Sequence, residues 1–373
     1  MEGQREATPS RLGLISDPDF PELVADNLAR VLPEHLSDPQ GWVVEVEVDP
    51  ITAGAYSTAE ILRAVRRRRE QRGWDYAICV TDLPVRLDHR PVLADANVEQ
   101  RVAVVSLPAL GGAQPQRRAK QVILQLLDEL TGPTGHPARN GNTGRRRGLR
   151  SPLTDLLAPI RRETVTEDGE VDIRYRATRT RGRLRLLTGM VRTNRPWRLV
   201  FGLSSALAAA LATSAYALSS STVWQIGDEL GPARHLGIAM ASVVLLVVWL
   251  ITAHHLWETR RRNSARDREQ VMFYNASTVL TLSIGVVCMY LGLFVLSFGI
   301  ATFLISTELL ARNLGHPVGW GSYFTLAWGV TTMGVIAGAL GSSLETDADV
   351  RRAAYGYREE QRRAQQQHDP DNE

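Results

Sequence analysis

Residues 277–305 read STVLTLSIGVVCMYLGLFVLSFGIATFLI and contain no charged side chain. A helix needs about 20 mostly apolar residues to cross the roughly 30 Å of hydrocarbon in a bilayer. Three shorter stretches without charge, residues 200–218, 236–253 and 320–341, lie on either side of this one. The sequence therefore predicts four membrane-spanning helices within residues 200–341, forming an all-α bundle, and none in the first third of the chain.

Arginines concentrate in alternate connections between these stretches. Five lie in the loop between the second and third stretches, and five follow the fourth stretch in the tail of residues 342–373. The other two loops, residues 219–235 and 306–319, carry one arginine each. Basic residues in short loops stay on the cytoplasmic side of a membrane. We therefore expect a multi-pass protein of a bacterial inner membrane with both termini in the cytoplasm.

The first third of the chain has the pattern of an α/β domain, predicted for residues 11–132. Short apolar runs alternate with stretches in which apolar residues recur at helical spacing. The predicted strands are residues 12–16, 42–48, 76–81 and 101–107, and the predicted helices are 20–32, 57–72 and 116–130. Residues 84–99 are expected to form an edge strand or a hairpin. About 120 residues suffice for an independent core.

A basic segment connects this domain to the first predicted span. Residues 133–150 are rich in Gly, Pro, Asn and Arg and are predicted as a linker, followed by a juxtamembrane segment over residues 151–199. Alternation around Asp168-Gly169 predicts a hairpin. Residues 182–193 have the pattern of an amphipathic helix, for which two interpretations stay open: packing on the α/β domain, or binding of anionic lipid headgroups. The headgroup-binding residues would be Arg181, Arg183, Arg185 and Arg192.

Charge and cysteine content bear on possible partners. Residues 1–135 contain 15 basic and 20 acidic residues, so the domain is net acidic. The arginine run at residues 66–69 ends a predicted helix and has no interleaved aromatic residues, so a solvated helix end is favoured over nucleic-acid binding. The two cysteines, Cys79 and Cys288, fall in different regions, so neither a disulfide nor a cysteine metal site is expected.

Several short stretches resemble, in their order, the archaemetzincin-type zinc peptidases. They are Tyr56-Ser-Thr-Ala-Glu-Ile-Leu62, Asp75-Tyr-Ala-Ile-Cys-Val-Thr-Asp-Leu-Pro84, Val102-Ala-Val-Val-Ser106 and Lys120-Gln121. The resemblance implies that the last helix would carry the zinc motif His-Glu-x-x-His-x-x-Gly-x-x-His. This chain instead has Leu124, Gln125, Asp128 and Thr134 at the ligand and base positions, and His136 lies two residues late. The resemblance implies a peptidase fold that has lost its metal.

Few other patterns point to a chemical activity. The chain has no Gly-x-Gly-x-x-Gly, no Walker-type Gly-Lys-Ser/Thr and no Gly-x-Ser-x-Gly, so no cofactor is expected. Four residues between the predicted strands could surround a small ligand or a cation, with a solvated loop as the alternative. They are Asp82, Asp88, His89 and Asp95.

Within the predicted spans, small residues are the clearest signal. Glycines recur every seven residues in the third span, and the fourth span has a small-xxx-small spacing, a pattern that permits close helix packing. These packing residues are Gly285, Gly292, Gly299, Gly334 and Gly338. The predicted result is a tight bundle that is either complete in one chain or continued into a homodimer. His254 and His255, at the end of the second span, would anchor the helix or sense pH.

The spans, together with the tail Ala353-Ala-Tyr-Gly-Tyr-Arg358, resemble four-span membrane proteins of GC-rich bacteria, a resemblance that implies no particular activity. We expect a non-enzymatic membrane protein whose cytoplasmic α/β domain binds a ligand or a protein partner. The expected environment is a bilayer with anionic headgroups, and no nucleic acid is expected to bind. Two alternatives stay open: a channel or carrier gated by the domain, and a membrane-tethered zincin-like hydrolase.

Overall fold

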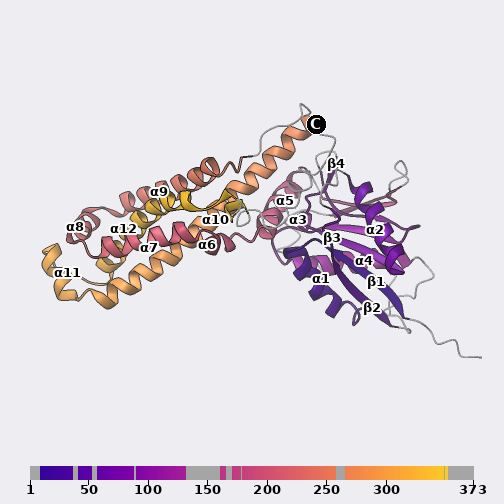
Figure 1. The fold of residues 1–373 in the computed structure, drawn as a ribbon, viewed down its shortest axis with the longest axis horizontal. Coiled ribbons are helices and arrows are strands. Elements are labelled where there is room, and N and C mark those ends of the chain that lie inside the picture. Colours follow the sequence, from indigo (N-terminus) through magenta and orange to yellow (C-terminus); the bar gives the residue numbers. More distant parts are fainter. Residues whose placement is uncertain are drawn as a thin grey trace, which may run out of the picture. The chain divides into compact units, whose positions relative to one another are not determined.

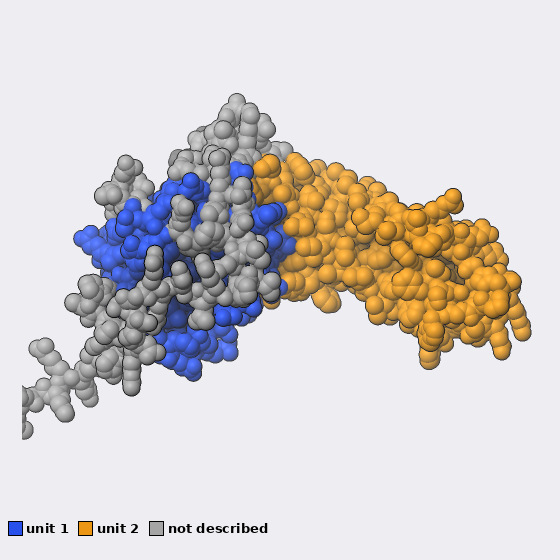
Figure 2. Space-filling view, turned by 180° about the vertical axis from the view of Figure 1, so that it is seen from behind, with its two compact units in different colours: residues 1–194, 357–373 blue, residues 195–356 orange. Residues whose placement is uncertain are grey.

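The computed structural model describes residues 9–36, 41–52, 57–87, 90–131, 160–164, 170–177, 179–257, 265–347 and 349–351. The chain divides into two units, residues 1–194 with 357–373 and residues 195–356 (Figure 2). The first unit is a mixed α/β sheet domain and the second is helical (Figure 1).

One sheet organises the first unit, in the order β2-β1-β3-β6-β5-β8-β7, with β4 paired to β5. The strands β2, β1, β3 and β6 are parallel, and β5, β8 and β7 continue the sheet in antiparallel pairs. The bounds are β1 Ser10–Ser16, β2 Trp42–Val48, β3 Tyr76–Thr81, β4 Arg86–Leu87, β5 Arg90–Asn97, β6 Val102–Ser106, β7 Ile160–Thr164 and β8 Ile173–Ala177.

Helices cover both faces of the sheet. The helix α2 buries Ile61, Leu62 and Val65 in one core with strand residues that include Ile15 and Cys79. The helices α1 and α4 contact each other, as expected on the opposite face, because right-handed crossovers place α1 and α2 on different sides. The bounds are α1 Phe20–Val31, α2 Thr58–Arg72, α3 Leu107–Leu110, α4 Pro115–Thr131 and α5 Arg179–Thr193.

Both predicted hairpins are present, but their places in the sheet differ from those expected. The segment 84–99 does form a hairpin of β4 and β5, but β5 is not an edge strand, because it pairs with β6 on one side and β8 on the other. The strands predicted around Asp168-Gly169 pair as a hairpin, with Thr164 opposite Ile173, while the turn itself lies outside the described residues. This hairpin belongs to the α/β sheet, so the domain extends beyond residue 132.

The helix α5 also belongs to the first unit. Gly189 lies so close to α3 that a Cβ atom there would overlap the carbonyl oxygen of Pro108. A Cβ atom on Gly112 would lie 2.7 Å from the carbonyl oxygen of Thr188. Of the two interpretations of residues 182–193, the structure therefore supports packing on the α/β domain.

Gly189→Ala should loosen this contact and destabilise the first unit by about 1–3 kcal/mol, the usual cost of overpacking. Hydrogen exchange across residues 182–193 of the full-length protein should become faster. Gly237→Ala is the matched control, because no atom lies within 4 Å of the added methyl group. Equal exchange in the two variants would mean that α5 does not depend on the close approach at Gly189.

The second unit is built around α12, which contacts α7, α9 and α10. Its main core includes Ala206 and Ala210 of α7, Leu246 of α9, Leu282 of α10 and Val335 of α12. The bounds are α6 Arg198–Gly202, α7 Ser204–Leu218, α8 Ser221–Glu229, α9 Pro232–Ala253, α10 Ala265–Leu304, α11 Thr307–Leu314 and α12 Trp320–Gly341, followed by the 3-10 turn Ser342–Leu344.

Three helices of this unit are long and apolar enough to cross a membrane: Pro232–Ala253, Val271–Leu304 and Trp320–Leu344. The prediction of four spans is therefore only partly supported. The stretch predicted as the first span ends in a sharp bend of 89° between α7 and α8. The 15 residues of α7 reach only about 22 Å at 1.5 Å per residue. The count becomes four only if α7 and α8 together form one broken span.

The small residues of the helices have different surroundings. A Cβ atom on Gly334 would overlap Ser214 Oγ, one on Gly338 would lie 3.1 Å from the carbonyl oxygen of Ala206, and one on Gly285 would lie 2.9 Å from that of Pro196. Gly292 and Gly299 have no atom within 4 Å of such a position. The expectation that both pack against a neighbouring helix is therefore not met within one chain.

Candidate functional site

The order of the parallel strands reverses at β1. The chain passes from β1 to β2 on one side and then returns to β3 on the other side. In open α/β sheets, ligands bind in the crevice outside the carboxyl ends of the strands at such a reversal. The carboxyl ends of β1 and β3 therefore locate the candidate site of the first unit.

A buried carboxylate lies at this point. Thr52 Oγ1 lies 2.8 and 2.7 Å from the two carboxylate oxygens of Asp17, and Thr81 Oγ1 donates to Asp17 Oδ2 at 2.5 Å. All three side chains are buried. A buried carboxylate is tolerated only when hydrogen bonds replace its hydration. Asp17 thus ties together the end of β1, the loop after β2 and the end of β3.

The segment after β3 is fixed across the neighbouring strand ends. Leu83 N donates to Thr81 Oγ1 at 2.9 Å, and Ser106 Oγ, at the end of β6, donates to the carbonyl oxygen of Leu83 at 2.5 Å. These bonds hold the partly exposed Asp82 at the carboxyl edge of the sheet. Asp82 and Asp19, which follow adjacent parallel strands, are therefore the candidate rim residues.

The structure describes two of the four predicted pocket residues, Asp82 and Asp95, and it gives Asp95 a different role. Asp88 and His89 lie outside the described residues. Asp95 lies within β5, is 0% exposed, and forms a bidentate ion pair with Arg174 at 2.8 and 2.9 Å. Burial raises the pKa of Asp95, and the hydrogen bonds from Arg174 oppose that shift. Asp95 was expected in a loop that surrounds a ligand, whereas the structure buries it in β5 as the partner of Arg174.

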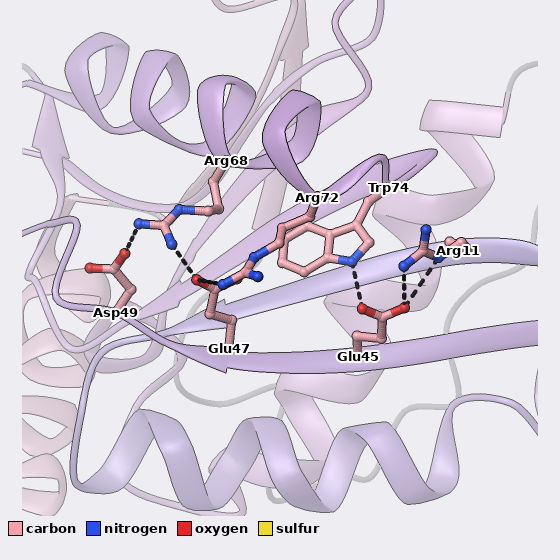
Figure 3. A network of polar contacts seen from close by, with 7 residues as sticks. All are labelled: Arg11, Glu45, Glu47, Asp49, Arg68, Arg72 and Trp74. Carbon is pink, nitrogen blue, oxygen red and sulfur yellow. Dashed lines mark hydrogen bonds and ion pairs between the residues drawn. The ribbon is translucent and has the colours of Figure 1, made fainter.

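The arginine run at the end of α2 pairs with carboxylates of the same chain. Arg68 contacts Glu47 and Asp49, and Arg72 Nε donates to Glu47 Oε2 at 2.9 Å (Figure 3). The hydrogen bond from Arg72 is the main cause that lowers the pKa of Glu47. Two arginines of the run 66–69, Arg66 and Arg68, thus pair with carboxylates of the same chain, as does the following Arg72.

The same surface contains a second network, which joins β1, β2 and the end of α2. Trp74 Nε1 donates to Glu45 Oε2 at 2.9 Å, and Arg11 Nη2 donates to Glu45 Oε1 at 2.7 Å (Figure 3). The hydrogen bond from Trp74, followed by that from Arg11, lowers the pKa of Glu45. A neighbouring steric constraint explains Gly13, because a Cβ atom there would overlap the ring of Trp74.

The arginines predicted to bind lipid headgroups differ in exposure. Arg185 is only 6% exposed, and its Nε donates to the carbonyl oxygen of Leu110 at 3.0 Å. Burial, with a smaller contribution from the charge of Arg118, lowers the pKa of Arg185 to about 10. Its assignment to headgroups is therefore corrected. Arg183 and Arg192 are partly exposed, and the side chain of Arg181 lies outside the described residues.

The helix aligned with the zinc motif packs by its apolar stripe. Ile123, Leu126, Leu127 and Leu130 are buried, whereas Gln125 and Asp128 are exposed. Thr134 and His136 lie outside the described residues. Within the described ranges, no group of three or more His, Cys, Asp or Glu residues is placed to hold a metal ion.

The buried cluster at the strand ends was missed in the sequence, although a signal exists. Asp17, Thr81 and Ser106 each stand at or directly after the end of a buried apolar run, where the carboxyl end of a parallel strand is expected. No protein-family model, curated protein or solved structure matches the chain. The function is therefore argued from this geometry alone.

Proposed function

We propose that the chain is an integral membrane protein whose α/β domain faces the cytoplasm and binds a small ligand or a protein partner, while the helical unit anchors that domain. The binding site is the carboxyl edge of the parallel strands, between β1 and β3. The chain acts there as a binding protein rather than as an enzyme. In the bilayer, α7 and α8 form a broken first span, and α9, α10 and α12 form the other three.

The observation that carries this proposal is the buried Asp17 carboxylate at the strand-order reversal. Its bonds with Thr52 and Thr81 pre-organise the loops that surround the crevice. A site with pre-organised loops loses less conformational entropy when a ligand binds. Asp82 and Asp19, at the rim, then supply carboxylates for donor groups of the ligand or partner.

The surface of the helical unit supports the membrane assignment. Large apolar side chains are exposed along α9, α10 and α12, among them Val244, Val295 and Ile336. Exposed aromatic side chains occur at both ends of the apolar helices, as in the belts that flank a bilayer core. They are Trp197, Phe201 and Trp257 at one end and Tyr216, Phe303 and Trp320 at the other.

The proposed topology can be tested by cysteine labelling of intact cells. A Cys288→Ala background removes the exposed native thiol, and Cys79 is buried. A membrane-impermeant maleimide should label Gly231→Cys and Gly319→Cys, both exposed positions with open space around them, and should miss Ala265→Cys. Labelling at residue 265 from outside the cell would contradict both cytoplasmic termini.

The proposed binding edge can be tested by purification from native membranes. The tagged full-length protein should retain a small molecule or protein that is reduced about tenfold in Asp82→Ala, since one lost charged hydrogen bond has roughly that effect. Glu70→Ala is the control, because Glu70 is an exposed acid near the end of α2, at the opposite edge of the sheet. Mass spectrometry should find equal amounts in the wild type and the control. Equal retention by the wild type, Asp82→Ala and Glu70→Ala would mean that Asp82 takes no part in the binding.

A further inference from the structure

The segment after α12 folds back onto the ends of α7 and α9. Glu345 Oε1 accepts a hydrogen bond from Ser205 N, in the first turn of α7, at 2.5 Å. His254, which follows α9, donates from Nδ1 to Asp347 Oδ1 at 3.0 Å. Arg351 Nη2 donates to the carbonyl oxygen of His254 at 3.2 Å, and Val350 is fully buried in the main core of the helical unit. These contacts hold the imidazole and the guanidinium group beside one carboxylate.

Each of these two side chains keeps a buried nitrogen atom without a hydrogen-bond partner in the described part of the chain. These atoms are His254 Nε2 and Arg351 Nε, and the indole Nε1 of Trp249, five residues before His254 on α9, is in the same condition. His254 is only 3% exposed. An unsatisfied buried polar group costs about 1–3 kcal/mol, so three at one end of a helix indicate a missing partner.

For Arg351 Nε and Trp249 Nε1 the missing partner must be an acceptor. Arg351 Nε and Trp249 Nε1 carry hydrogen and can only donate. His254 Nδ1 donates to Asp347, so Nε2 accepts in the neutral imidazole and donates only in the imidazolium form. The hydrogen bond from His254 also lowers the pKa of Asp347, which keeps that carboxylate ionised beside the imidazole and the guanidinium. The guanidinium of Arg351 supplies the fixed positive charge of the cluster.

We propose that a phosphate group, from an anionic phospholipid headgroup or from a soluble phosphate compound, binds at the end of α9 between His254 and Arg351. A phosphate oxygen can accept from the guanidinium and the imidazole together, which are charge-assisted bonds. Asp347, whose side chain is 52% exposed, and the partly exposed Arg351 form the surface of the cluster. A phosphate group can therefore approach from that side.

The position of the cluster favours the lipid source. His254 directly follows the apolar helix Pro232–Ala253, so its side chain lies at headgroup depth if α9 spans the bilayer. This choice of source rests on the proposed function, whereas phosphate binding itself does not. The site also differs from the one predicted on α5, because Arg185 is buried against the carbonyl oxygen of Leu110.

The test uses the purified full-length protein in uncharged detergent micelles and measures its melting temperature. The probes are phosphatidylglycerol, phosphatidylcholine and inorganic phosphate, each titrated separately. Phosphatidylglycerol should raise the melting temperature more than phosphatidylcholine does. The variants His254→Gln and Arg351→Gln should need about tenfold more phosphatidylglycerol for the same rise, since each removes a charge-assisted bond. Arg234→Gln, at the exposed start of the same helix, should behave as the wild type.

The probes distinguish the two sources. A rise with phosphatidylglycerol alone identifies the headgroup, and a variant-sensitive rise with inorganic phosphate identifies a soluble ligand. If His254→Gln does not fold, Arg351→Gln and the wild type still decide, because the side chain of Arg351 is 22% exposed. The proposal is overturned if neither probe stabilises the wild type, or if the variants respond as Arg234→Gln does. Either result is independent of the labelling experiment, which tests membrane topology in cells.

Discussion

Asp95→Ala should lower the free energy of unfolding of the α/β domain by about 3–5 kcal/mol, the cost of breaking a buried ion pair by removing one partner. Arg174 is 5% exposed and would keep its charge without the two carboxylate oxygens at 2.8 and 2.9 Å. Since β5 and β8 pair directly, this loss should separate the hairpin of β7 and β8 from the sheet. Pulse proteolysis of the full-length protein in increasing urea measures the change.

Two controls separate the cost of leaving Arg174 without its carboxylate from the contribution of the ion pair itself. Asp95→Leu combined with Arg174→Met should recover much of the stability, because apolar residues of similar volume replace buried ion pairs well. Glu45→Ala removes a partly exposed carboxylate that pairs with Arg11 and accepts a hydrogen bond from Trp74 Nε1. It should cost less, about 1–3 kcal/mol, mainly because the buried Trp74 Nε1 loses its acceptor. If Asp95→Ala costs no more than Glu45→Ala, the pair does not hold the strands together.

Patterns of neighbouring residues predicted many of the strands and helices of the first unit. The alternation of Trp42–Val48 and the helical spacing in Pro115–Thr131 depend on neighbouring residues, so strand β2 and helix α4 could be read from the sequence. The place of β5 could not be, because it depends on a strand about 80 residues later, whose Arg174 pairs with Asp95. A lone aspartate between strands gives no sign of a distant partner, so Asp95 was assigned to a pocket.

The candidate site was predictable only in part for the same reason. Polar residues at the ends of apolar runs are visible in the sequence, but the order β2-β1-β3 that brings Asp17 beside Thr81 is a tertiary property. For Arg185, the local sequence pattern suggested the wrong environment. Its helical pattern with Leu184 and Leu186 fits a membrane surface, while the close approach at Gly189 decides that α5 packs on the α/β domain.

Gly334→Leu should destabilise the helical unit by about 3 kcal/mol, at the upper end of the usual overpacking cost. The added side chain would overlap Ser214 Oγ, and its Cβ atom would lie 2.8 Å from the carbonyl oxygen of Ala210. Backbone atoms of α7 cannot move aside as a flexible side chain would. The melting temperature of the detergent-solubilised protein should therefore fall by several degrees.

Gly292→Leu is the matched control, because it adds the same side chain to an apolar helix where no atom lies within 4 Å of the new Cβ. Within one chain it should change stability by less than about 0.5 kcal/mol. The exposed side chains around it, Leu291 and Val295, are apolar, so lipid or a second copy of the chain would cover this face. A loss at Gly292 as large as that at Gly334 would mean that a second copy packs there, and the oligomer should then dissociate in the Gly292→Leu variant. A loss confined to Gly334 would leave the face to lipid and make the interface of α7 and α12 the contact that sets bundle stability.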